Sequence, residues 1–465
     1  MISTVYIAKT VYGGDGLGRL GDGRVVFVPG AWAGEQVRAE IVEEKKNYVK
    51  ARLIEVVERS PERRTRDERQ ETWVPGMVYD TLSLEGELNA KEQQLREFFE
   101  RARIAVGEFK EGASPSSRDR NVASPLNYRN KVVYHFGRSK GDATILQQER
   151  KGDATFLSRE KNAPTTFPIG YRTEPSHEII DVPVDPLARP EINAALPAIR
   201  RSVLQLLTTG PEAVRRDTER KGNVTVRWTK KSGVKWWIGE APKDLVLKET
   251  TCGLDFEVSA DGFYQVNPEV GEALVKTVVE EYARGAAEAP DVLDLYCGVG
   301  VFGLCCLKRA PAGARLIGIE SGRQAIDCAK RNAENLFNHH SPASASTSTP
   351  TPNSNSNSNS NSNSNSNFRF YAEQVGRNLR RIPVNPRTTV IIDPPRGGLE
   401  PGVAKWLAQS RAARIFYVSC DPATLMRDLR EITRTYEVES VRWFNMFPRT
   451  ARFETLVVLR PRKMR

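Results

Sequence analysis

The sequence predicts an α/β protein: a doubly wound, mostly parallel C-terminal sheet, preceded by an N-terminal small β-barrel and a central α+β domain. Three observations lead to this prediction. From about residue 262, strand-like apolar runs alternate with helix-like segments, as in doubly wound sheets. The first 58 residues alternate apolar and polar side chains between Gly-Asp-Gly and Pro-Gly turns, as short strands do. The stretch between them mixes both patterns.

Residues 1–58 are expected to form the barrel, which would resemble other small barrels that bind single-stranded nucleic acids. Its basic side chains suit a groove that follows a phosphate backbone, but they suit a solvated barrel surface equally well. These side chains are Arg19, Arg24, Arg38, Lys45, Lys46, Lys50 and Arg52.

Residues 59–90 are expected to hold a charged linker and the start of the central domain, and residues 91–260 the central α+β domain itself. Helical periodicity runs over residues 82–102, and strand patterns cover residues 223–229 and 234–240. The segment NYRNKVVYHF, residues 127–136, carries aromatic and basic side chains that fit either an RNA clamp or an ordinary strand with half its face in the core.

Residues 261–465 are expected to form the doubly wound, Rossmann-like domain. Asn267 predicts a helix N-cap before Pro268, and Ser321 predicts another. The predicted helices span 267–286, 301–310 and 321–337, and the predicted strands span 291–297, 314–320, 368–373, 388–395 and 414–420. The insertion 341–367 has no apolar residue larger than alanine, so it is expected to be a disordered surface loop.

The composition favours a cytoplasmic protein with a polyanionic partner. Lys and Arg number 69 against 58 Asp and Glu, a formal net charge of +11, which points first to nucleic acid. No apolar stretch is long enough to span a membrane. The 6 cysteines show no disulfide framework, and the 4 histidines show no zinc-ligand spacing, so no metal is expected. We expect a monomer.

A glycine-rich loop marks the expected cofactor site. Gly298, Gly300 and Gly303 have G-x-G-x-x-G spacing between a strand and a helix, and Glu320 ends the next strand, which on its own would suit a nicotinamide dinucleotide. That interpretation leaves Asp393 and Cys420 unexplained. Because the carboxyl ends of the strands line one crevice, Glu320, Asp393 and Cys420 should converge there. A sulfonium cofactor such as S-adenosylmethionine suits such an acidic crevice better.

Five motifs, in this order, resemble the RNA uracil-5-methyltransferase family, whose members use S-adenosylmethionine to make 5-methyluridine in tRNA or rRNA. The motifs are FYQVNP, DLYCGVG, IIDPPRGGL, YVSCDPATLMRDL and FPRTARFETLVVL. The first 58 residues resemble the TRAM domain, an RNA-binding barrel that many members carry. The sequence YRNK, at residues 128–131, resembles the start of the family's central domain.

The resemblance implies a methyl transfer to carbon 5 of a uridine through a covalent cysteine adduct, with tRNA or rRNA as the partner. By position, Cys420 matches the nucleophile and Glu454 the general base. Four further positions match those that bind the cofactor, namely Gln265, Tyr296, Glu320 and Asp393.

Two departures from the family pattern matter. Many members with a TRAM domain hold an iron–sulfur cluster on four cysteines. Here the corresponding region has none of the first three, and Asp185 stands where the fourth would be, so no cluster is expected. Arg452 stands where the family often has histidine. A nearby cation would lower the pKa of Glu454, which predicts activity into mildly acidic pH.

Simpler interpretations remain open from sequence alone. Cys420 can be a small core residue, Asp393 a helix N-cap and Glu454 a surface strand residue. The other five cysteines are interpreted as core residues. Among activities, an amino-group methyltransferase, a cytosine-5 methyltransferase, a dehydrogenase and a non-catalytic RNA-binding protein are the alternatives. Arg396 argues against the first, because such enzymes usually carry an aromatic residue after Asp-Pro-Pro.

Overall fold

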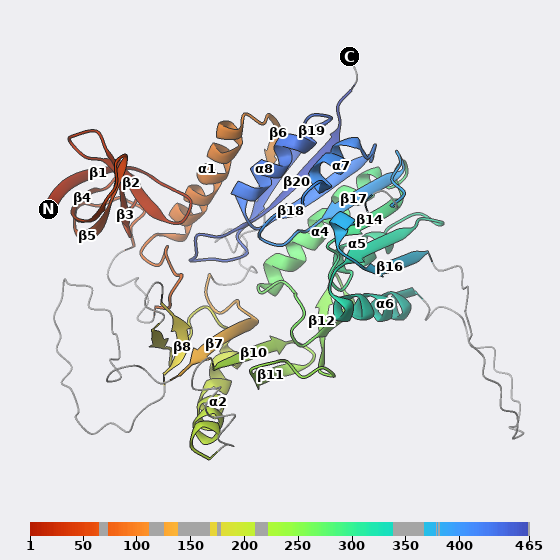
Figure 1. Ribbon diagram of the computed structural model, residues 1–465, viewed down its shortest axis with the longest axis horizontal. Coiled ribbons are helices and arrows are strands. Elements are labelled where there is room, and N and C mark those ends of the chain that lie inside the picture. Colours follow the sequence, from red (N-terminus) through yellow and green to blue (C-terminus); the bar gives the residue numbers. More distant parts are fainter. Residues whose placement is uncertain are drawn as a thin grey trace, which may run out of the picture.

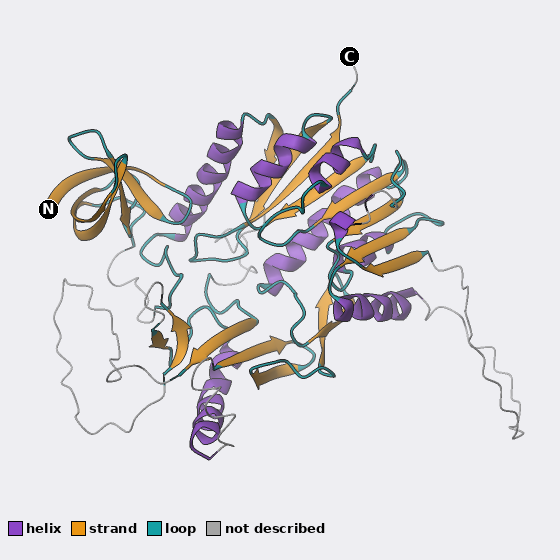
Figure 2. Cartoon of the chain, in the orientation of Figure 1, coloured by secondary structure: helices purple, strands orange, loops and turns teal. Residues whose placement is uncertain are grey.

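The computed structural model describes residues 1–64, 73–110, 125–137, 168–173, 178–209, 222–337, 367–377, 379 and 382–463. Within these residues the chain forms a barrel near the N-terminus, a central sheet with one helix, and a large sheet with helices on both faces (Figure 1). Figure 2 shows the same arrangement by element type. No helix in these ranges is long and apolar enough to cross a membrane.

The first five strands close into the predicted barrel in the order β1-β2-β3-β5-β4. All neighbours are antiparallel except β3 and β5, which are parallel. Alternate side chains of these strands point inward and pack a small apolar core that includes Val5, Val26 and Val49. The strands are β1 (Ile2–Thr10), β2 (Asp15–Arg19), β3 (Val25–Pro29), β4 (Gln36–Glu44) and β5 (Tyr48–Glu58).

The central part is an antiparallel sheet in the order β11-β10-β7-β8-β9, against which α2 packs. Its strands are β7 (Lys131–Phe136), β8 (Ile169–Arg172), β9 (Ile179–Asp181), β10 (Asn223–Thr229) and β11 (Gly233–Ile238), and its helix is α2 (Pro190–Thr209). A two-stranded ribbon, β12 (Val246–Thr251) with β13 (Leu254–Ser259), follows. Tyr128, Tyr134 and Phe136 are at most 1% exposed, so these rings serve the core and are not an RNA-stacking platform.

The large sheet has eight strands in the order β16-β15-β14-β17-β18-β20-β19-β6. The five strands from β16 to β18 are parallel, and β20 is antiparallel to both of its neighbours. The fold class predicted from the sequence is therefore confirmed. The strands are β14 (Asp291–Leu295), β15 (Leu316–Glu320), β16 (Phe368–Ala372), β17 (Thr388–Ile392), β18 (Arg414–Ser419), β19 (Tyr436–Phe444) and β20 (Glu454–Pro461).

Two apolar clusters cover the two faces of this sheet. Helices α4, α5 and α6 contribute to one cluster, and α1, α7 and α8 to the other. The helices are α1 (Leu84–Ala102), α4 (Pro268–Gly285), α5 (Val301–Leu307), α6 (Arg323–Phe337), α7 (Val403–Gln409) and α8 (Pro422–Ile432).

The far edge of the large sheet differs from what the sequence indicates. Strand β6 (Val106–Lys110) pairs in parallel with β19, and the preceding helix α1 packs on α8. Leu95 and Phe99 of α1 are buried in the same cluster as Leu429. Residues expected in the central domain thus complete the C-terminal sheet, because burying the apolar stripe of α1 requires that surface.

The predicted helix starts have different outcomes. The side chain of Asn267 accepts a hydrogen bond from the backbone N–H of Val270, so the predicted N-cap of α4 is confirmed. The prediction for Ser321 is wrong. Helix α6 begins only at Arg323, and the Ser321 hydroxyl donates to the carboxylate of Glu320 instead. The acidic side chain at the strand end competes for that hydroxyl.

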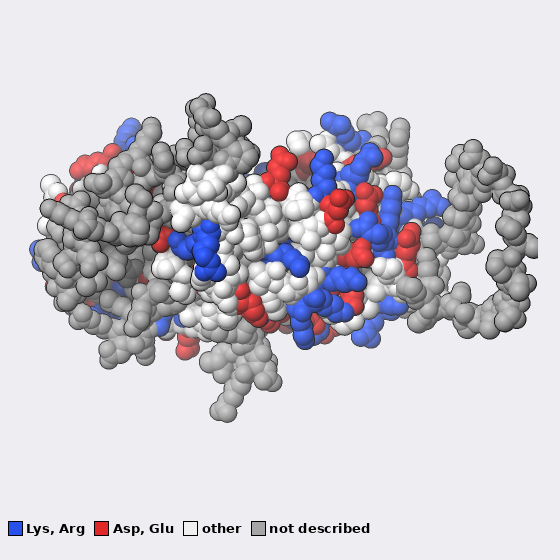
Figure 3. Space-filling view, turned by 90° about the horizontal axis from the view of Figure 1, so that it is seen from below, with Lys and Arg blue, Asp and Glu red and all other residues white. Residues whose placement is uncertain are grey.

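Some expectations fall outside the described ranges. Residues 341–366 of the predicted insertion and residues 65–72 of the predicted linker lie there. The surface that the structure describes mixes both signs of charge. Figure 3 shows basic and acidic side chains interspersed over the described part of one face.

Candidate active site

The candidate site lies at the carboxyl ends of the parallel strands. Tyr296 follows β14, Asp393 follows β17 and Cys420 follows β18, and these three strands are neighbours in the sheet. Because the strands are parallel, their carboxyl ends meet at one edge. The alternation of strands and helices in the sequence therefore brings three distant residues to one edge of the sheet.

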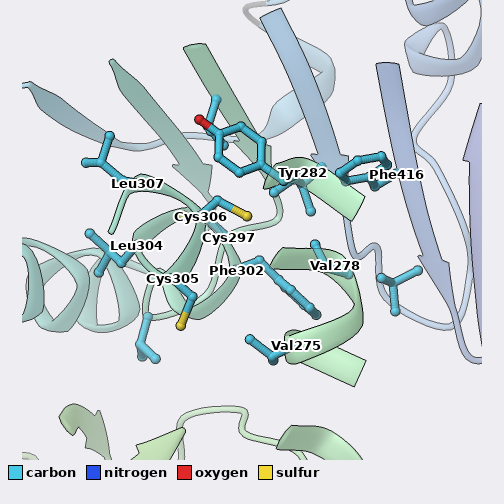
Figure 4. Packing of buried hydrophobic residues seen from close by; sticks show 14 of the residues in the cluster. Val275, Val278, Tyr282, Cys297, Phe302, Leu304, Cys305, Cys306, Leu307 and Phe416 are labelled. Carbon is cyan, nitrogen blue, oxygen red and sulfur yellow. The ribbon is translucent and has the colours of Figure 1, made fainter. Parts of the chain in front are cut away.

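A cleft opens at this edge. Gln265, Tyr296 and Asp393 are among its lining residues. Its walls are otherwise largely apolar, and the remaining lining residues are Thr251, Phe263, Tyr264, Pro268, Gly271, Glu272, Val275, Cys297, Gly298, Val299, Val301 and Phe302. Two of these lining residues, Val275 of α4 and Phe302 of α5, point toward each other in the apolar cluster (Figure 4).

The glycine-rich loop has a backbone that most side chains would not tolerate. Tyr296 has a φ of 61°, Gly298 of 53° and Gly300 of 88°. The Asp294 carboxylate accepts a hydrogen bond from the N–H of Gly303 at 2.9 Å, which ties the loop to the helix after it. Burial raises the pKa of Asp294 to about 8. Sequence reasoning missed Asp294, although its place two residues before Tyr296 was a usable signal.

Glu320 lies at the end of β15, outside the cleft lining. Its carboxylate accepts hydrogen bonds from the N–H of Gly322 at 2.7 Å and from the Ser321 hydroxyl at 3.0 Å. The side chain is half-buried, and its Oε2 atom has no hydrogen-bond partner among the described residues. It remains able to accept from a ligand at the edge of the cleft.

Cys420 and Glu454 come from adjacent strands. Ser419 of β18 pairs with Thr455 of β20, so Cys420 and Glu454 are the next residues along this antiparallel pair. Glu454 is only 4% exposed, and its Oε2 atom has no hydrogen-bond partner among the described residues. The interpretation of Glu454 as a surface residue is therefore wrong.

The pKa values of Cys420, Asp393 and Glu454 are all raised, so each of these groups favours its protonated form more than usual. Burial raises the pKa of Cys420 to about 12, with the charges of Glu454, Asp393 and Asp421 adding to the rise. Burial also raises the pKa of Asp393 to about 7. Burial, and then the charge of Asp393, hold the pKa of Glu454 well above its usual range.

The expectation that Arg452 lowers the pKa of Glu454 is wrong. Burial of the Glu454 carboxyl group raises its pKa more than the partly exposed Arg452 cation could lower it. Burial has this effect because removal from water penalises the charged form directly. Arg452 acts on the thiol instead, where it opposes the rise in the pKa of Cys420.

A buried polar network holds the loop that leads to Glu454. The Lys91 ammonium donates to a Glu87 carboxylate oxygen at 2.8 Å and to the Asn445 side-chain oxygen at 2.7 Å. Arg449, with a φ of 64°, donates through its side chain to the Leu82 carbonyl at 2.8 Å. Sequence reasoning missed this network, since its members are far apart along the chain.

The basic side chains of the barrel are mostly paired with acids on the barrel itself. Arg24 contacts Asp22 and Glu44, and Lys45 and Lys50 contact Glu43. Arg38 pairs with Glu55, and Arg52 with Glu40. These pairs weaken the field that an unpaired basic groove would present.

Within the described ranges, no group of three or more His, Cys, Asp or Glu side chains could hold a metal ion. Asp185, which stands where the resemblance puts a fourth cluster cysteine, is fully buried. It accepts hydrogen bonds from the hydroxyls of Tyr134 at 3.1 Å and Tyr171 at 2.6 Å. In this chain Asp185 therefore holds two tyrosine side chains of the central sheet in place.

Comparison with known families and proteins gives consistent results. Residues 243–462 match the family described as tRNA (Uracil-5-)-methyltransferase, and residues 4–54 match the TRAM domain. An uncharacterized RNA methyltransferase of Thermotoga maritima is 29% identical over 99% of both chains. Another, from Thermosynechococcus vestitus, is 26% identical over 96% of this chain and 95% of its own.

One solved structure shares the whole architecture. The tRNA (uracil-54, C5)-methyltransferase of Pyrococcus abyssi, in complex with S-adenosyl-L-homocysteine, superposes with a TM-score of 0.62. The two chains are 19% identical, and the match covers 98% of this chain and 100% of the other. At that identity the likeness supports the fold. Taken with the two family matches, these findings lead to one conclusion: the protein is an RNA methyltransferase whose residues 243–462 match the tRNA (uracil-5-)-methyltransferase family, and it carries a TRAM domain at its N-terminus.

Proposed function

We propose that the protein transfers a methyl group from S-adenosylmethionine to carbon 5 of a uridine in tRNA or rRNA, through a covalent adduct with Cys420. The observation that carries the proposal is the side-by-side arrangement of Cys420 and Glu454 on β18 and β20, with Asp393 at the end of the neighbouring strand. A thiol nucleophile and a carboxylate base next to the same crevice are what this reaction needs.

The cleft suits S-adenosylmethionine better than a dinucleotide. Glu272 and Asp393, both acidic, are the charged side chains among the described lining residues. Acids favour a sulfonium cation and oppose a pyrophosphate. We infer that Glu320 holds the ribose hydroxyls, while Gln265, Tyr296 and Asp393 line the remainder of the cofactor site. When bound, S-adenosylmethionine supplies an electrophilic methyl group.

The role of Cys420 follows from the weak nucleophilicity of carbon 5 in uracil. The thiol of Cys420 loses its proton, and the thiolate forms a bond to carbon 6. The electron pair of the 5,6 double bond moves into an enolate, which makes carbon 5 nucleophilic. With S-adenosylmethionine bound, carbon 5 would accept the methyl group, and the sulfonium sulfur would keep the electron pair of its broken bond to that methyl group.

Glu454 completes the reaction as the general base. The methylated adduct still carries its original hydrogen on carbon 5. Glu454, once ionised, removes this hydrogen as a proton, the 5,6 double bond re-forms, and the bond from carbon 6 to the sulfur of Cys420 breaks. Burial raises the pKa of Glu454, which makes the ionised carboxylate a stronger base than an exposed one.

RNA is the proposed partner because family, barrel and overall charge all agree with it. The target uridine must leave its base stack to reach a crevice at the strand ends. Loops of structured RNA make that extrusion least costly. The protein is proposed to act as a monomer in the cytoplasm.

The test uses total RNA from cells in which the gene has been deleted. Purified protein and S-adenosylmethionine carrying a labelled methyl group should convert one uridine to 5-methyluridine, identified by mass spectrometry of nuclease digests. Label on cytosine or on an amino group would refute the proposal and favour the rival methyltransferases. Calorimetry should detect binding of S-adenosylmethionine and none of NAD. Absence of both binding and label would favour a non-catalytic RNA-binding protein.

A further inference from the structure

We propose that Tyr12, carried by the N-terminal barrel, is a substrate-contacting residue of the methyl-transfer site, and that its hydroxyl donates a hydrogen bond to an oxygen of the target nucleotide. This inference rests on the proposed function. It gives the barrel a second role, in which one of its turns forms part of the wall of the reaction site.

The turn between β1 and β2 is fixed against the catalytic part of the chain. The side-chain amide of Gln94, in α1, donates to the backbone carbonyls of Thr10 and Val11, each at 3.2 Å. Lys9 pairs with Glu97 of the same helix at 2.6 Å.

Gly14, in the same turn, lies so close to Val78 that a Cβ atom there would come within 2.8 Å of a Val78 methyl carbon. Its φ of 97° is also one that glycine adopts readily and other residues rarely do. The turn therefore packs tightly against Val78.

The ring of Tyr12 reaches the catalytic loop. It packs edge-on against Phe98 of α1, with ring centroids 5.6 Å apart, and against Phe453, with centroids 5.9 Å apart. Phe453 directly precedes Glu454, the proposed base. Two aromatic contacts therefore orient the Tyr12 ring against Phe453, the residue before the proposed base.

The hydroxyl of Tyr12 is buried and has no hydrogen-bond partner among the residues that the structure describes. Other buried tyrosines nearby do have partners: the Tyr79 oxygen accepts from Gln94 at 3.1 Å, and the Tyr128 hydroxyl donates to the Pro448 carbonyl at 3.2 Å. Leaving a buried hydroxyl unpaired destabilises the folded state. Phenylalanine would fill the same space without this cost, so the hydroxyl points to a ligand.

The groups around Tyr12 identify that ligand as the substrate. Burial and the charge of Asp421 raise the pKa of Tyr12 to about 12, with Cys420 adding to the rise and Arg452 and Arg396 opposing it. Tyr12 is therefore within electrostatic reach of the proposed nucleophile, and its phenol stays protonated as a donor at neutral pH. A base whose carbon 6 bonds to Cys420 must enter this same region.

The decisive variant is Tyr12→Phe, which removes the hydroxyl and keeps both ring contacts. Tyr6→Phe is the matched control, because Tyr6 lies on β1, the strand that leads into this turn, and is 60% exposed. Methyl transfer is measured under single-turnover conditions on total RNA from gene-deleted cells. Thermal unfolding and calorimetry with S-adenosylmethionine are measured in parallel.

We expect Tyr12→Phe to slow methyl transfer by about tenfold or more, as loss of one hydrogen bond to a reacting group does. Affinity for S-adenosylmethionine should not change. The melting temperature should stay constant or rise, because an unpaired buried hydroxyl has been removed. Tyr6→Phe should behave as wild type in all three measurements.

The failures can be told apart. Wild-type protein that methylates no uridine would overturn both the proposed function and the role of Tyr12. Wild-type activity with an equally active Tyr12→Phe variant would overturn the role of Tyr12 alone. A Tyr12→Phe variant that loses activity only in proportion to a lowered melting temperature would make Tyr12 a packing residue and overturn the inference too.

Discussion

The carboxylate of Glu87 accepts hydrogen bonds from the backbone N–H of Arg449, at 3.0 Å to one oxygen and 3.1 Å to the other. Glu87 lies in α1, and Arg449 lies in the loop that joins β19 to β20 and ends at Glu454. A fully buried acid in the first turn of α1 therefore fixes the loop that leads to the proposed base.

This contact gives a stability prediction. Glu87→Ala should lower the free energy of unfolding by about 3–5 kcal/mol, because Lys91 is then left buried without its counter-charge. Glu92→Ala is the control, since its pair with Arg96 in the same helix is exposed and is worth about 0.5 kcal/mol or less. Urea denaturation compares the two, and equal losses would contradict the importance of the buried network.

Removal of the proposed nucleophile should separate binding from chemistry. Cys420→Ala should bind S-adenosylmethionine normally and lose methyl transfer, because only the thiol is missing from the cleft edge. RNA containing 5-fluorouridine should trap the wild-type protein covalently, since fluorine cannot leave as a cation. The trapped species is visible on a denaturing gel. Appreciable methylation by Cys420→Ala would exclude the nucleophile role.

Replacement of the proposed base should stall the last step. Glu454→Gln still allows Cys420 to add and the methyl group to transfer, but the amide cannot accept the proton from carbon 5. A methylated covalent RNA adduct should therefore accumulate without any fluorinated analogue. Normal turnover with no adduct would mean that another residue is the base.

Activity should rise with pH. Burial raises the pKa of Cys420 to about 12, and the pKa of Glu454 is also raised, so both reactive forms are scarce in acid. We expect the single-turnover rate to increase steadily from about pH 6 to about pH 9, as for other reactions that need deprotonated groups. A rate that persists unchanged into mildly acidic buffer would restore the original expectation for Arg452.

Stability should show the opposite trend. Burial raises the pKa of Asp393 from 3.8 in the unfolded chain to about 7, so the folded state holds this proton more tightly. Its stabilising contribution is complete below pH 3.8 and is lost as the pH rises through about 7. Asp393→Asn should remove that part of the pH dependence in urea titrations, and Asp244→Asn, at an exposed turn, should leave it intact. Identical pH profiles for all three proteins would contradict the shift.

The predicted insertion should be dispensable. Its flanking residues are close together, since the rings of Phe337, which ends α6, and Phe368, which starts β16, have centroids 6.0 Å apart. Replacing residues 341–366 by a short Gly-Ser turn should leave methyl transfer within a few-fold of wild type, because a short connection can close this gap. A collapse in melting temperature or RNA affinity would show a further role.

The strands that carry the site could be predicted because they are buried on both faces. Strands β14, β17 and β18 are short, rich in apolar residues and almost fully buried, and the residue after each strand falls at the carboxyl end of the sheet. Asp393 and Cys420 could be identified by that rule alone. Glu454 could be identified only from the resemblance of its motif to the family, because nothing in the sequence pattern around it distinguishes a buried carboxylate from an exposed one.

Other parts of the fold and of the site could not be predicted from the sequence, because they depend on contacts between residues that are far apart along the chain. Strand β6 is five residues long and extends only because β19 offers it an edge. Tyr12 is a single aromatic residue in a glycine-rich turn, and its place in the site depends on how the barrel docks. The pKa of Glu454 was predicted in the wrong direction because Arg452 is visible in the sequence and burial is not.

The pairing of β6 with β19 has a consequence for biosynthesis. During translation α1 and β6 leave the ribosome long before β19 and β20 are made. The large sheet therefore cannot complete its edge until β19 has been made. Until then the apolar stripe of α1 lacks its native cover, and such nascent surfaces are those that chaperones bind. Pairing across this separation in sequence also slows folding, since the chain must close a very long loop before the contact forms.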